Sequence, residues 1–155
     1  MKENFCPFCN PAVLKSTFAE SENFRAVYNL APVLPGHILI VPKKHLSKFL
    51  EIDEALIAEM VSFSRKIIKV IAKAFKTDSF DWTIQDGKPA GQTVEHMHMH
   101  IIPRHENDLP DPGDWYPMLK KKTEAFIDST NRNKLSEEEI VNICQNLKKN
   151  YRELF

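Results

Sequence analysis

The sequence predicts an α+β fold, in which strands and helices occupy separate stretches of one chain. Three observations support this class. Five short runs have the composition or alternation of strands, one long amphipathic helical stretch lies between the third and fourth of them, and a second helical stretch closes the chain. The 155 residues have the length of one ordinary domain, so we expect residues 1–155 to form a single domain.

Three strands are expected in the N-terminal part of the chain. Residues 17–20 and 24–28 are aromatic or β-branched runs on either side of a polar stretch, which predicts a hairpin. Residues 37–42 form an apolar run after the turn-rich residues 32–36, and a proline ends it. We therefore expect this third run to be a buried strand, with His37 at its start.

A long amphipathic helix is expected after residue 53. Asp53 has the residue type of a helix N-cap. The apolar residues that follow recur at the spacing of one helix face, namely at Leu56, Ile57, Met60, Val61, Ile67, Ile68, Ile71 and Ala74. Because this stripe is long, we expect the helix to cover the sheet.

The fourth and fifth runs predict a second hairpin. Residues 80–85 and 94–103 have the composition of strands, and residues 86–91 between them contain the glycines and proline of a tight loop. Pro103 is expected to end the pairing of the last strand, because proline lacks the N–H that a ladder needs.

A last helix is expected from Ser136 toward Tyr151. Ser136 and Glu139 have the spacing of a capping box, which marks a helix start. Cys144 falls on the apolar face of this helix, so we expect it to be a thiol in the core. The chain has 3 cysteines, and an odd number does not describe a disulfide framework.

Charge and hydropathy argue against two classes of partner. Lysine plus arginine balances aspartate plus glutamate at 21 each, so no large field of one sign points to duplex nucleic acid or to a membrane surface. The first residues lack the apolar core of a signal peptide, and no window approaches the ~18 apolar residues of a spanning helix. We therefore expect a cytoplasmic protein, and the charge balance is compatible with a small phosphorylated ligand.

The most informative motif is the alternation of His96, His98 and His100 with two methionines. A side-chain period of two places the three imidazoles on one face of a strand, about 6.5–7 Å apart, which is close enough to surround one anionic group. Two other interpretations stay open at this point. In the first, the histidines are structural. In the second, they are ligands of a catalytic zinc, because histidine is the commonest metal ligand.

Residues 96–102, with the sequence HMHMHII, resemble the His-φ-His-φ-His-φ-φ motif of the histidine triad superfamily. The similarity extends to Asn29, residues 35–39 and residues 85–94, and covers roughly residues 5–116. These positions have the spacing of the branch that resembles the fragile histidine triad protein, a dinucleoside polyphosphate hydrolase. Gln85 at the start of the loop and the pair Pro103-Arg104 after the triad favour this branch over the nucleoside phosphoramidases.

This resemblance implies a fold and an assembly. Family members have an antiparallel sheet of about five strands with one long helix across it, usually doubled in a homodimer with a continuous sheet. The elements expected above supply the same parts in α+β order, together with a C-terminal helix. A homodimer is expected on the resemblance alone.

The resemblance also implies a chemistry, which the residue types support. His98 is expected to attack the α-phosphorus of a dinucleoside polyphosphate and to form a nucleotidyl-histidine that water then hydrolyses. His96 and His100, with the amides of Gln85 and Gln92, are suited to holding the phosphate oxygens. For His98 to present a lone pair, its other ring nitrogen should donate to a fixed acceptor such as a backbone carbonyl. A magnesium ion would come with the polyphosphate of the substrate.

The nucleoside should be bound by the N-terminal half of the chain. Asn29 matches the ribose-binding position of the family, and His37 is a candidate for the wall of the base or phosphate pocket. Phe5, Phe8 and Leu39 are candidates for an apolar slot that holds a purine. Each has a structural alternative, as a turn residue, a strand-end histidine or ordinary core.

Cys6 and Cys9 form a C-x-x-C pair that is unlike the fragile histidine triad protein itself. Two thiolates at this spacing supply half of a tetrahedral zinc site. By resemblance to zinc-containing triad proteins, His45 and His96 are expected to complete a structural site, which would leave the other two triad histidines for catalysis. A metal-free or redox-active C-x-x-C is the alternative.

Three other functions stay open on the sequence alone. They are a nucleoside phosphoramidase, a dinucleoside polyphosphate phosphorylase that needs phosphate as co-substrate, and a regulatory module that binds nucleotides with little turnover. Turnover that disappears when His98 is replaced would favour an enzyme over the module.

Overall fold

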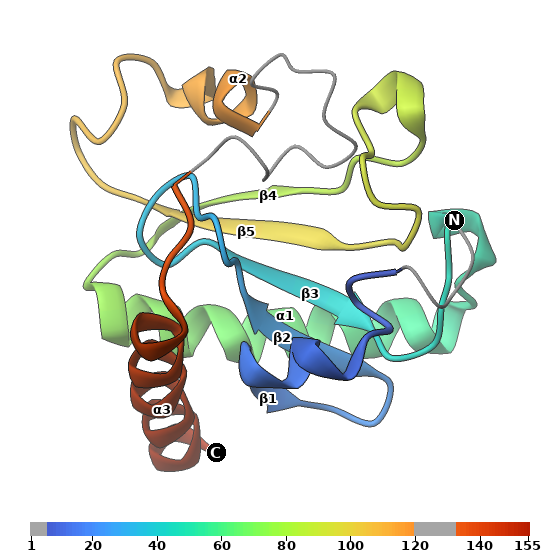
Figure 1. Ribbon diagram of the computed structural model, residues 1–155, viewed down its shortest axis with the longest axis horizontal. Coiled ribbons are helices and arrows are strands. Elements are labelled where there is room, and N and C mark those ends of the chain that lie inside the picture. Colours follow the sequence, from blue (N-terminus) through green and yellow to red (C-terminus); the bar gives the residue numbers. More distant parts are fainter. Residues whose placement is uncertain (1–5, 120–132) are drawn as a thin grey trace.

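The centre of the fold is an antiparallel sheet, seen in a computed structural model that describes residues 6–119 and 133–155. Within those residues the sheet has five strands in the order β1-β2-β3-β5-β4. The strands are β1 (Thr17–Glu20), β2 (Phe24–Tyr28), β3 (Ile38–Pro42), β4 (Ser79–Thr83) and β5 (Met99–Arg104). Strand β5, which carries the last triad histidine, lies between β3 and the edge strand β4 (Figure 1). With its helices, this sheet confirms the expected α+β architecture.

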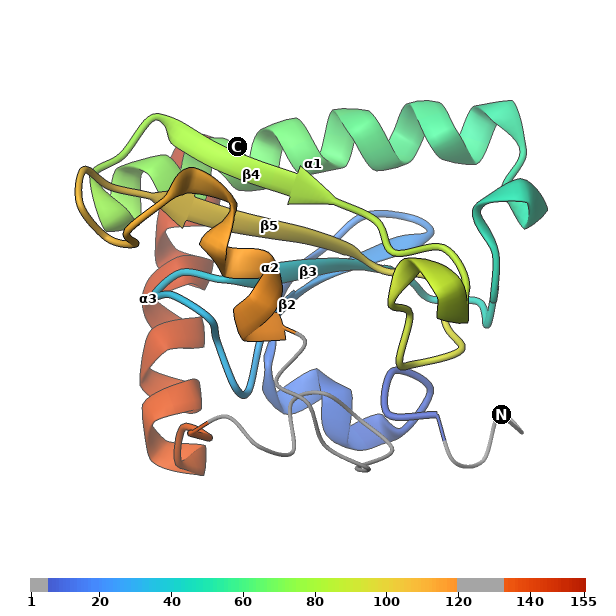
Figure 2. The same cartoon turned by 90° about the horizontal axis from the view of Figure 1, so that it is seen from above.

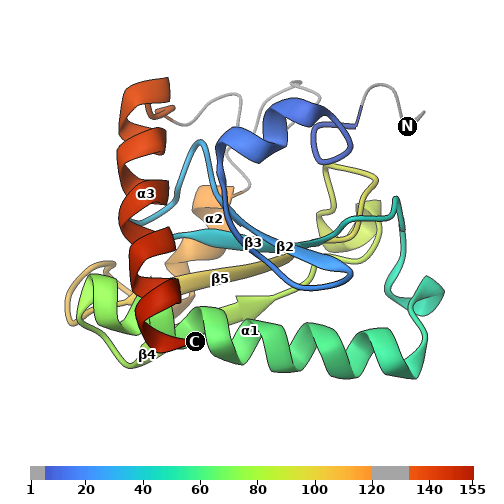
Figure 3. The ribbon, with the colours of Figure 1, turned by 90° about the horizontal axis from the view of Figure 1, so that it is seen from below.

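Helices lie on both faces of the sheet. The α-helices of the described residues are α1 (Glu54–Phe75), α2 (Trp115–Leu119) and α3 (Glu137–Leu154), and the 3-10 helices are η2 (Pro11–Lys15), η3 (Phe49–Glu51), η4 (Lys88–Ala90) and η5 (Pro112–Asp114). Helix α1 lies along one face, and η2 lies over the opposite face (Figure 2). Helix α3 packs against α1 and β1, and its axis lies at a steep angle to that of α1 (Figure 3). None of the described helices combines the length and apolar character that a membrane span needs.

Alternation along β3 sends side chains to the two faces of the sheet. Ile38 and Ile40 are completely buried in the main core under α1, whereas Leu39 and Val41 belong to a smaller apolar cluster on the opposite face. His100 pairs with Leu39 in the ladder, so its side chain emerges on that second face. The sheet therefore has its main core on one side and the triad histidine on the other.

Helix α1 confirms the expected amphipathic stretch and its start. The side chain of Asp53 accepts a hydrogen bond from the N–H of Leu56 at 2.8 Å, which caps the helix. Lys76 ends the helix in the left-handed conformation, with a φ of 54°. On the inward face, the hydroxyl of the fully buried Ser64 lies 3.7 Å from the sulfur of Met99. The apolar side of the triad segment thus rests on α1.

The observed strands agree with the predicted ones at β1 and β2 and differ slightly at β3 and β4. The expectation of a strand over residues 94–103 is wrong at its start, because β5 begins only at Met99. Strand β4 ends opposite His100 and gives no pairing partner beyond it. A loop holds the preceding residues instead, since the N–H of Met97 donates to the carbonyl of Leu46 at 2.7 Å.

Pro103 does not end the last strand, contrary to expectation. It pairs with Phe80 inside the ladder, which continues to Arg104. Pairing between β5 and β3 stops at Ile101 and Ile38, so on that side the missing N–H of the proline removes no ladder hydrogen bond. Proline is tolerated here because the strand has a paired neighbour on one side only.

Helix α3 confirms the predicted C-terminal helix and its core thiol. Ser136 and Glu139 form the expected capping box. Cys144 is buried and free, and its Sγ lies 3.4 Å from the carbonyl oxygen of Ser16. Burial raises the pKa of Cys144 to about 11, so this thiol stays protonated and packs as an apolar group at neutral pH.

Candidate active site and metal centre

A cavity of about 400 Å³ contains two of the three triad histidines. His98 and His100 line it, their ring centroids are 4.9 Å apart, and their exposed fractions are 7% and 5%. Further walls come from within residues 7–16 and 27–31 and from Leu39. The volume lies in the range of small-molecule sites, roughly 300–1,000 Å³.

The backbone holds His98 in one tautomer. Its Nδ1 lies 2.8 Å from the carbonyl oxygen of His96. A carbonyl only accepts hydrogen bonds, so Nδ1 carries the proton and Nε2 carries the lone pair of the neutral ring. This contact confirms the expected backbone acceptor and gives the imidazole the form of a nucleophile.

A second imidazole behind the cavity fixes the tautomer of His100. The N–H of Val33 donates to His37 Nδ1 at 3.2 Å, so His37 Nε2 carries the proton and donates to His100 Nδ1 at 2.9 Å. His100 Nε2 then carries the proton of the neutral ring, which makes it a donor for an anionic oxygen. His37 was expected to line the pocket, but it is completely buried and lies outside the cavity wall. Its position is one layer behind His100.

Three of the expected nucleoside-binding candidates line the cavity, namely Phe8, Asn29 and Leu39. The side-chain oxygen of Asn29 accepts a hydrogen bond from the N–H of Ala31 at 3.0 Å, which fixes the plane of its amide. Phe5, another of these candidates, lies outside the described residues.

Gln85 and Gln92 are buried but lie outside the cavity wall. Gln92 closes the loop between β4 and the triad, because its oxygen accepts from the N–H of Gly87 at 2.8 Å and its nitrogen donates to the carbonyl of Ser47 at 3.0 Å. Gln85 donates to Thr83 Oγ1 at 3.4 Å. Gly87 has a φ of 96°, which favours glycine at this point of the loop. The action of the two amides on a phosphate stays a prediction.

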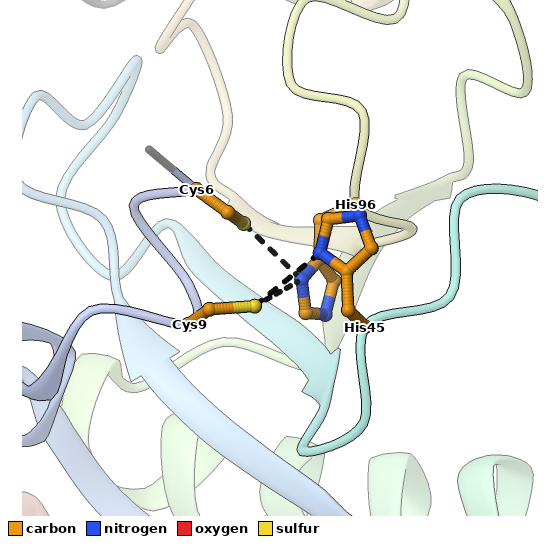
Figure 4. A group of neighbouring side chains, drawn as sticks. All are labelled: Cys6, Cys9, His45 and His96. Carbon is orange, nitrogen blue, oxygen red and sulfur yellow. Dashed lines mark hydrogen bonds between the residues drawn. The ribbon is translucent and has the colours of Figure 1, made fainter. Parts of the chain in front are cut away.

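Cys6, Cys9, His45 and His96 form a separate cluster, as the family resemblance implies (Figure 4). One ligand atom from each lies within 4.8 Å of the others. The distance from Sγ to Nδ1 is 3.3 Å for Cys6 and His96, 3.3 Å for Cys9 and His45, and 3.5 Å for Cys9 and His96. Zinc in tetrahedral geometry, with its usual bond lengths, separates sulfur and nitrogen ligands by about 3.6 Å. Two thiolates and two imidazoles at these separations fit a zinc ion.

His96 belongs to this cluster and not to the cavity wall. Its Nε2 donates to the carbonyl of Pro42 at 2.9 Å, which leaves the lone pair on the Nδ1 that faces the cysteines. Burial lowers the pKa of His96 to about 4, so the ring is neutral at neutral pH, as a metal ligand must be. Three imidazoles were expected around one anionic group. The structure brings two of them to the cavity and turns His96 toward the cysteines.

The cavity wall also includes a residue that no sequence pattern indicated. Lys134 lines the cavity, and it carries the one formal charge among the described residues that do so. The N–H of Leu135 donates to the carbonyl of Leu30 at 3.0 Å, which fixes the segment before α3 beside the residue that follows Asn29. This tertiary contact places the lysine at the site, so no local motif could have found it.

The chain is similar to known proteins in sequence and in structure. The profile of the HIT domain family matches residues 11–107. The bis(5'-adenosyl)-triphosphatase of Dictyostelium discoideum is 37% identical over 107 residues, which are 69% of this chain and 72% of that protein. The crystal structure of Plasmodium falciparum diadenosine triphosphate hydrolase in complex with cyclomarin A has a TM-score of 0.71 and 27% identity, over 90% of this chain and 78% of that one. A Zn-bound histidine triad family protein from Mycobacterium smegmatis shares the fold, with a TM-score of 0.71 and 24% identity over 98% and 96% of the two chains.

Proposed function

The chain belongs to the HIT domain family, and we propose that it hydrolyses dinucleoside polyphosphates at the α-phosphate through a nucleotidyl-His98 intermediate. The observation that carries this proposal is the fixed tautomer of His98 at a cavity of ligand size. The similarity to a bis(5'-adenosyl)-triphosphatase and to a diadenosine triphosphate hydrolase supports the substrate class.

In the proposed reaction, His98 Nε2 attacks the α-phosphorus in line with the bond to the bridging oxygen. A P–N bond forms, the bridging P–O bond breaks, and its electron pair leaves with the rest of the substrate. Water then attacks the same phosphorus and loses a proton to the solvent, the P–N electron pair returns to Nε2, and a nucleoside monophosphate is released. The hydrogen bond from Nδ1 to the carbonyl of His96 stabilises the ring while it carries positive charge.

Charge on the phosphate is proposed to be stabilised by His100, which donates from Nε2 to a non-bridging oxygen. The hydrogen bond from His37 supports this role because it keeps the His100 proton on that nitrogen. The amides of Gln85 and Gln92 are proposed to assist, as the family resemblance implies. Fixed donors of this kind are each worth about 10²–10³ in kcat.

The nucleoside is proposed to occupy the end of the cavity that is formed by Phe8 and Leu39. Both belong to the apolar cluster on this face of the sheet, which suits the flat, weakly polar surface of a base. A carbonyl oxygen accepts two hydrogen bonds, so Asn29 Oδ1, which accepts one from Ala31, has capacity for a ribose hydroxyl. Lys134 supplies positive charge beside an anionic ligand.

We also propose that Cys6, Cys9, His45 and His96 bind a structural zinc ion. The donor set and the separations of its atoms support this metal. When bound, zinc would crosslink the N-terminal turn to the triad segment. Thiolates and imidazoles are poor ligands for magnesium, so a magnesium ion in the reaction would be held by the phosphates of the substrate.

A homodimer is proposed from the family resemblance. The exposed edge of the sheet supports it, because β4 is an edge strand and its Trp82 is 46% exposed. Light scattering on purified protein tests the assembly, and the mass of a single chain would contradict it.

The catalytic proposal is tested with His98→Asn and diadenosine triphosphate as substrate. We expect turnover to be lost while AMP still binds, and quenching of the wild type during turnover with denaturant at alkaline pH, where a P–N bond survives, should yield a chain that carries one added AMP moiety by mass spectrometry. Near-native turnover in His98→Asn would require another nucleophile.

The alternative functions give different results in the same assay. A phosphorylase would need inorganic phosphate, and a phosphoramidase would prefer a nucleoside phosphoramidate to the dinucleotide. A regulatory module would bind AMP with negligible turnover of either substrate.

A further inference from the structure

The turn that carries the metal-ligating cysteines is also a wall of the cavity. Pro7 and Phe8, the two residues between Cys6 and Cys9, line the cavity together with His98. The ring centroids of Phe8 and His98 are 5.2 Å apart, and Phe8 packs against the apolar cluster on the same face of the sheet. A displacement of this turn would therefore move an apolar wall and the ring that packs beside the reactive imidazole.

The two sulfurs link this turn to the far side of the site. Within the turn, the N–H groups of Cys9 and Asn10 donate to the carbonyl of Cys6 at 3.2 and 3.1 Å, and these bonds shape the turn without attaching it to the sheet. The sulfurs reach across to His96 and His45 (Figure 4). A thiol is a weak hydrogen-bonding group, whereas structural zinc contributes folding energy outright. The position of the turn should thus depend strongly on metal ligation.

The cluster also reaches the triad segment and the glutamine loop by a second route. His45 immediately precedes Leu46 and Ser47 in the chain. The carbonyl of Leu46 accepts from the N–H of Met97 at 2.7 Å, and the carbonyl of Ser47 accepts from Gln92 Nε2 at 3.0 Å. The cluster therefore joins three segments that are distant in the sequence and that together build the site.

We propose that zinc binding and nucleotide binding are coupled through Phe8, because the metal holds the turn and the turn holds the Phe8 ring against the nucleoside and His98. This inference rests on the proposed nucleotide and zinc sites. It makes Cys6 and Cys9 positioning residues that set substrate affinity in addition to stability. Such coupling is reciprocal, so a nucleotide must tighten zinc binding by the factor by which zinc tightens nucleotide binding.

The coupling is measured with AMP, which contains the α-phosphate and nucleoside but has no bond left to cleave at a bridging oxygen. We expect the Kd of AMP, from calorimetry, to rise about tenfold when a chelator removes zinc from protein that stays folded by circular dichroism. We expect the Kd of zinc, from competition with a chromophoric chelator, to fall about tenfold at saturating AMP. Neither readout depends on turnover.

Two matched variants separate coupling through Phe8 from a general loss of stability. Phe8→Ala and Leu39→Ala each remove an apolar side chain from the same cluster, the first in the turn and the second on β3. Both should weaken AMP binding to the zinc-loaded protein. Phe8→Ala should also reduce the coupling factor to about one, whereas Leu39→Ala should leave it near the wild-type value.

An unchanged coupling factor in Phe8→Ala would overturn the inference. The test also applies where removal of zinc unfolds the chain. Coupling through unfolding does not need the Phe8 ring, so it would keep the coupling factor above one in both variants. Equal affinities for AMP in folded protein with and without zinc would also overturn it and leave the proposed hydrolase function intact. Failure of AMP to bind the zinc-loaded wild type would refute the nucleotide site itself, and the coupling with it.

Discussion

His98 donates from Nδ1 to the backbone carbonyl of His96 at 2.8 Å, so the residue whose side chain joins the cysteine–histidine cluster also orients the imidazole that we propose as the nucleophile. The two roles are compatible because they use different parts of one residue. The side chain of His96 turns to the cysteines, while its main chain stays next to His98. The two-residue spacing therefore brings the His96 side chain to the cysteines and the His98 side chain to the cavity.

Replacement of His37 by phenylalanine should slow catalysis and leave ligand binding nearly intact. The change keeps a ring at a fully buried position but removes the donor to His100 Nδ1. His100 would then take either tautomer, and we expect kcat to fall about 10- to 100-fold, or about 1.4–2.7 kcal/mol of transition-state stabilisation. Kinetics with diadenosine triphosphate and calorimetry with AMP measure the two effects. A lower Tm with an unchanged kcat would show that His37 is only structural.

Gln92→Ala should lower both stability and kcat. The variant loses the acceptor for the N–H of Gly87 and the donor to the carbonyl of Ser47 in a buried loop, so we expect the free energy of unfolding to fall by about 1–3 kcal/mol. We expect kcat to fall about 10-fold or more, measured well below the Tm. Gln85→Ala, which loses a longer contact of 3.4 Å, should lower kcat with a smaller loss of stability. Unchanged kinetics in both variants would show that the two glutamines stabilise the loop and do not act on the phosphate.

The cysteine pair predicts the metal content of the protein. Protein purified without added metal should contain about one zinc ion per chain, and Cys6→Ser with Cys9→Ser should remove the zinc and lower the Tm. Cys144→Ser is the matched control, because this thiol lies in the core outside the cluster. Elemental analysis should find zinc retained there. Full zinc loading of the double variant would contradict the proposed ligands.

Acid should release an ion pair that fixes the chain after β5. Arg104 donates to Asp108 from Nε at 2.9 Å and from a terminal nitrogen at 2.7 Å. These bonds hold the pKa of Asp108 at about 2, below its usual 3.8. Because the folded pKa is the lower one, the stabilisation is complete above the usual value and is lost as the pH falls through about 2.

Asp108→Asn measures this contribution. The shift corresponds to about 2 kcal/mol, so the variant should be less stable than the wild type by about that amount at neutral pH. The difference between the two in urea unfolding should shrink as the pH approaches 2. A difference that stays constant with pH would assign the effect to packing.

Local signals predicted the parts of this fold that depend on neighbours in the sequence. Asp53 and Ser136 cap α1 and α3 because their side chains reach N–H groups three residues ahead, which a sequence displays directly. The alternation around His98 likewise placed it at the site. The C-x-x-C spacing also indicated Cys6 and Cys9 as candidate zinc ligands. The addition of His45 and His96 came from the family resemblance and not from spacing.

Features that depend on distant partners were not predictable in this way. The start of β5 depends on where β4 ends, and the position of His37 behind the site depends on its contact with His100. Gln92 is held by Ser47, and Lys134 reaches the cavity through a contact with residue 30. Each of these positions is set by tertiary packing that leaves no periodic trace in the sequence.

The proposed zinc site joins Cys6 to His96 across 90 residues of chain. Contacts of such separation form late, because closing a long loop costs entropy before the contact is made. During synthesis the two cysteines leave the ribosome long before His96 does, and a nascent chain has no complete ligand set until then. Zinc uptake would therefore wait until the segment with His96 has emerged, and chains released before residue 96 should retain zinc poorly and keep two oxidisable thiols.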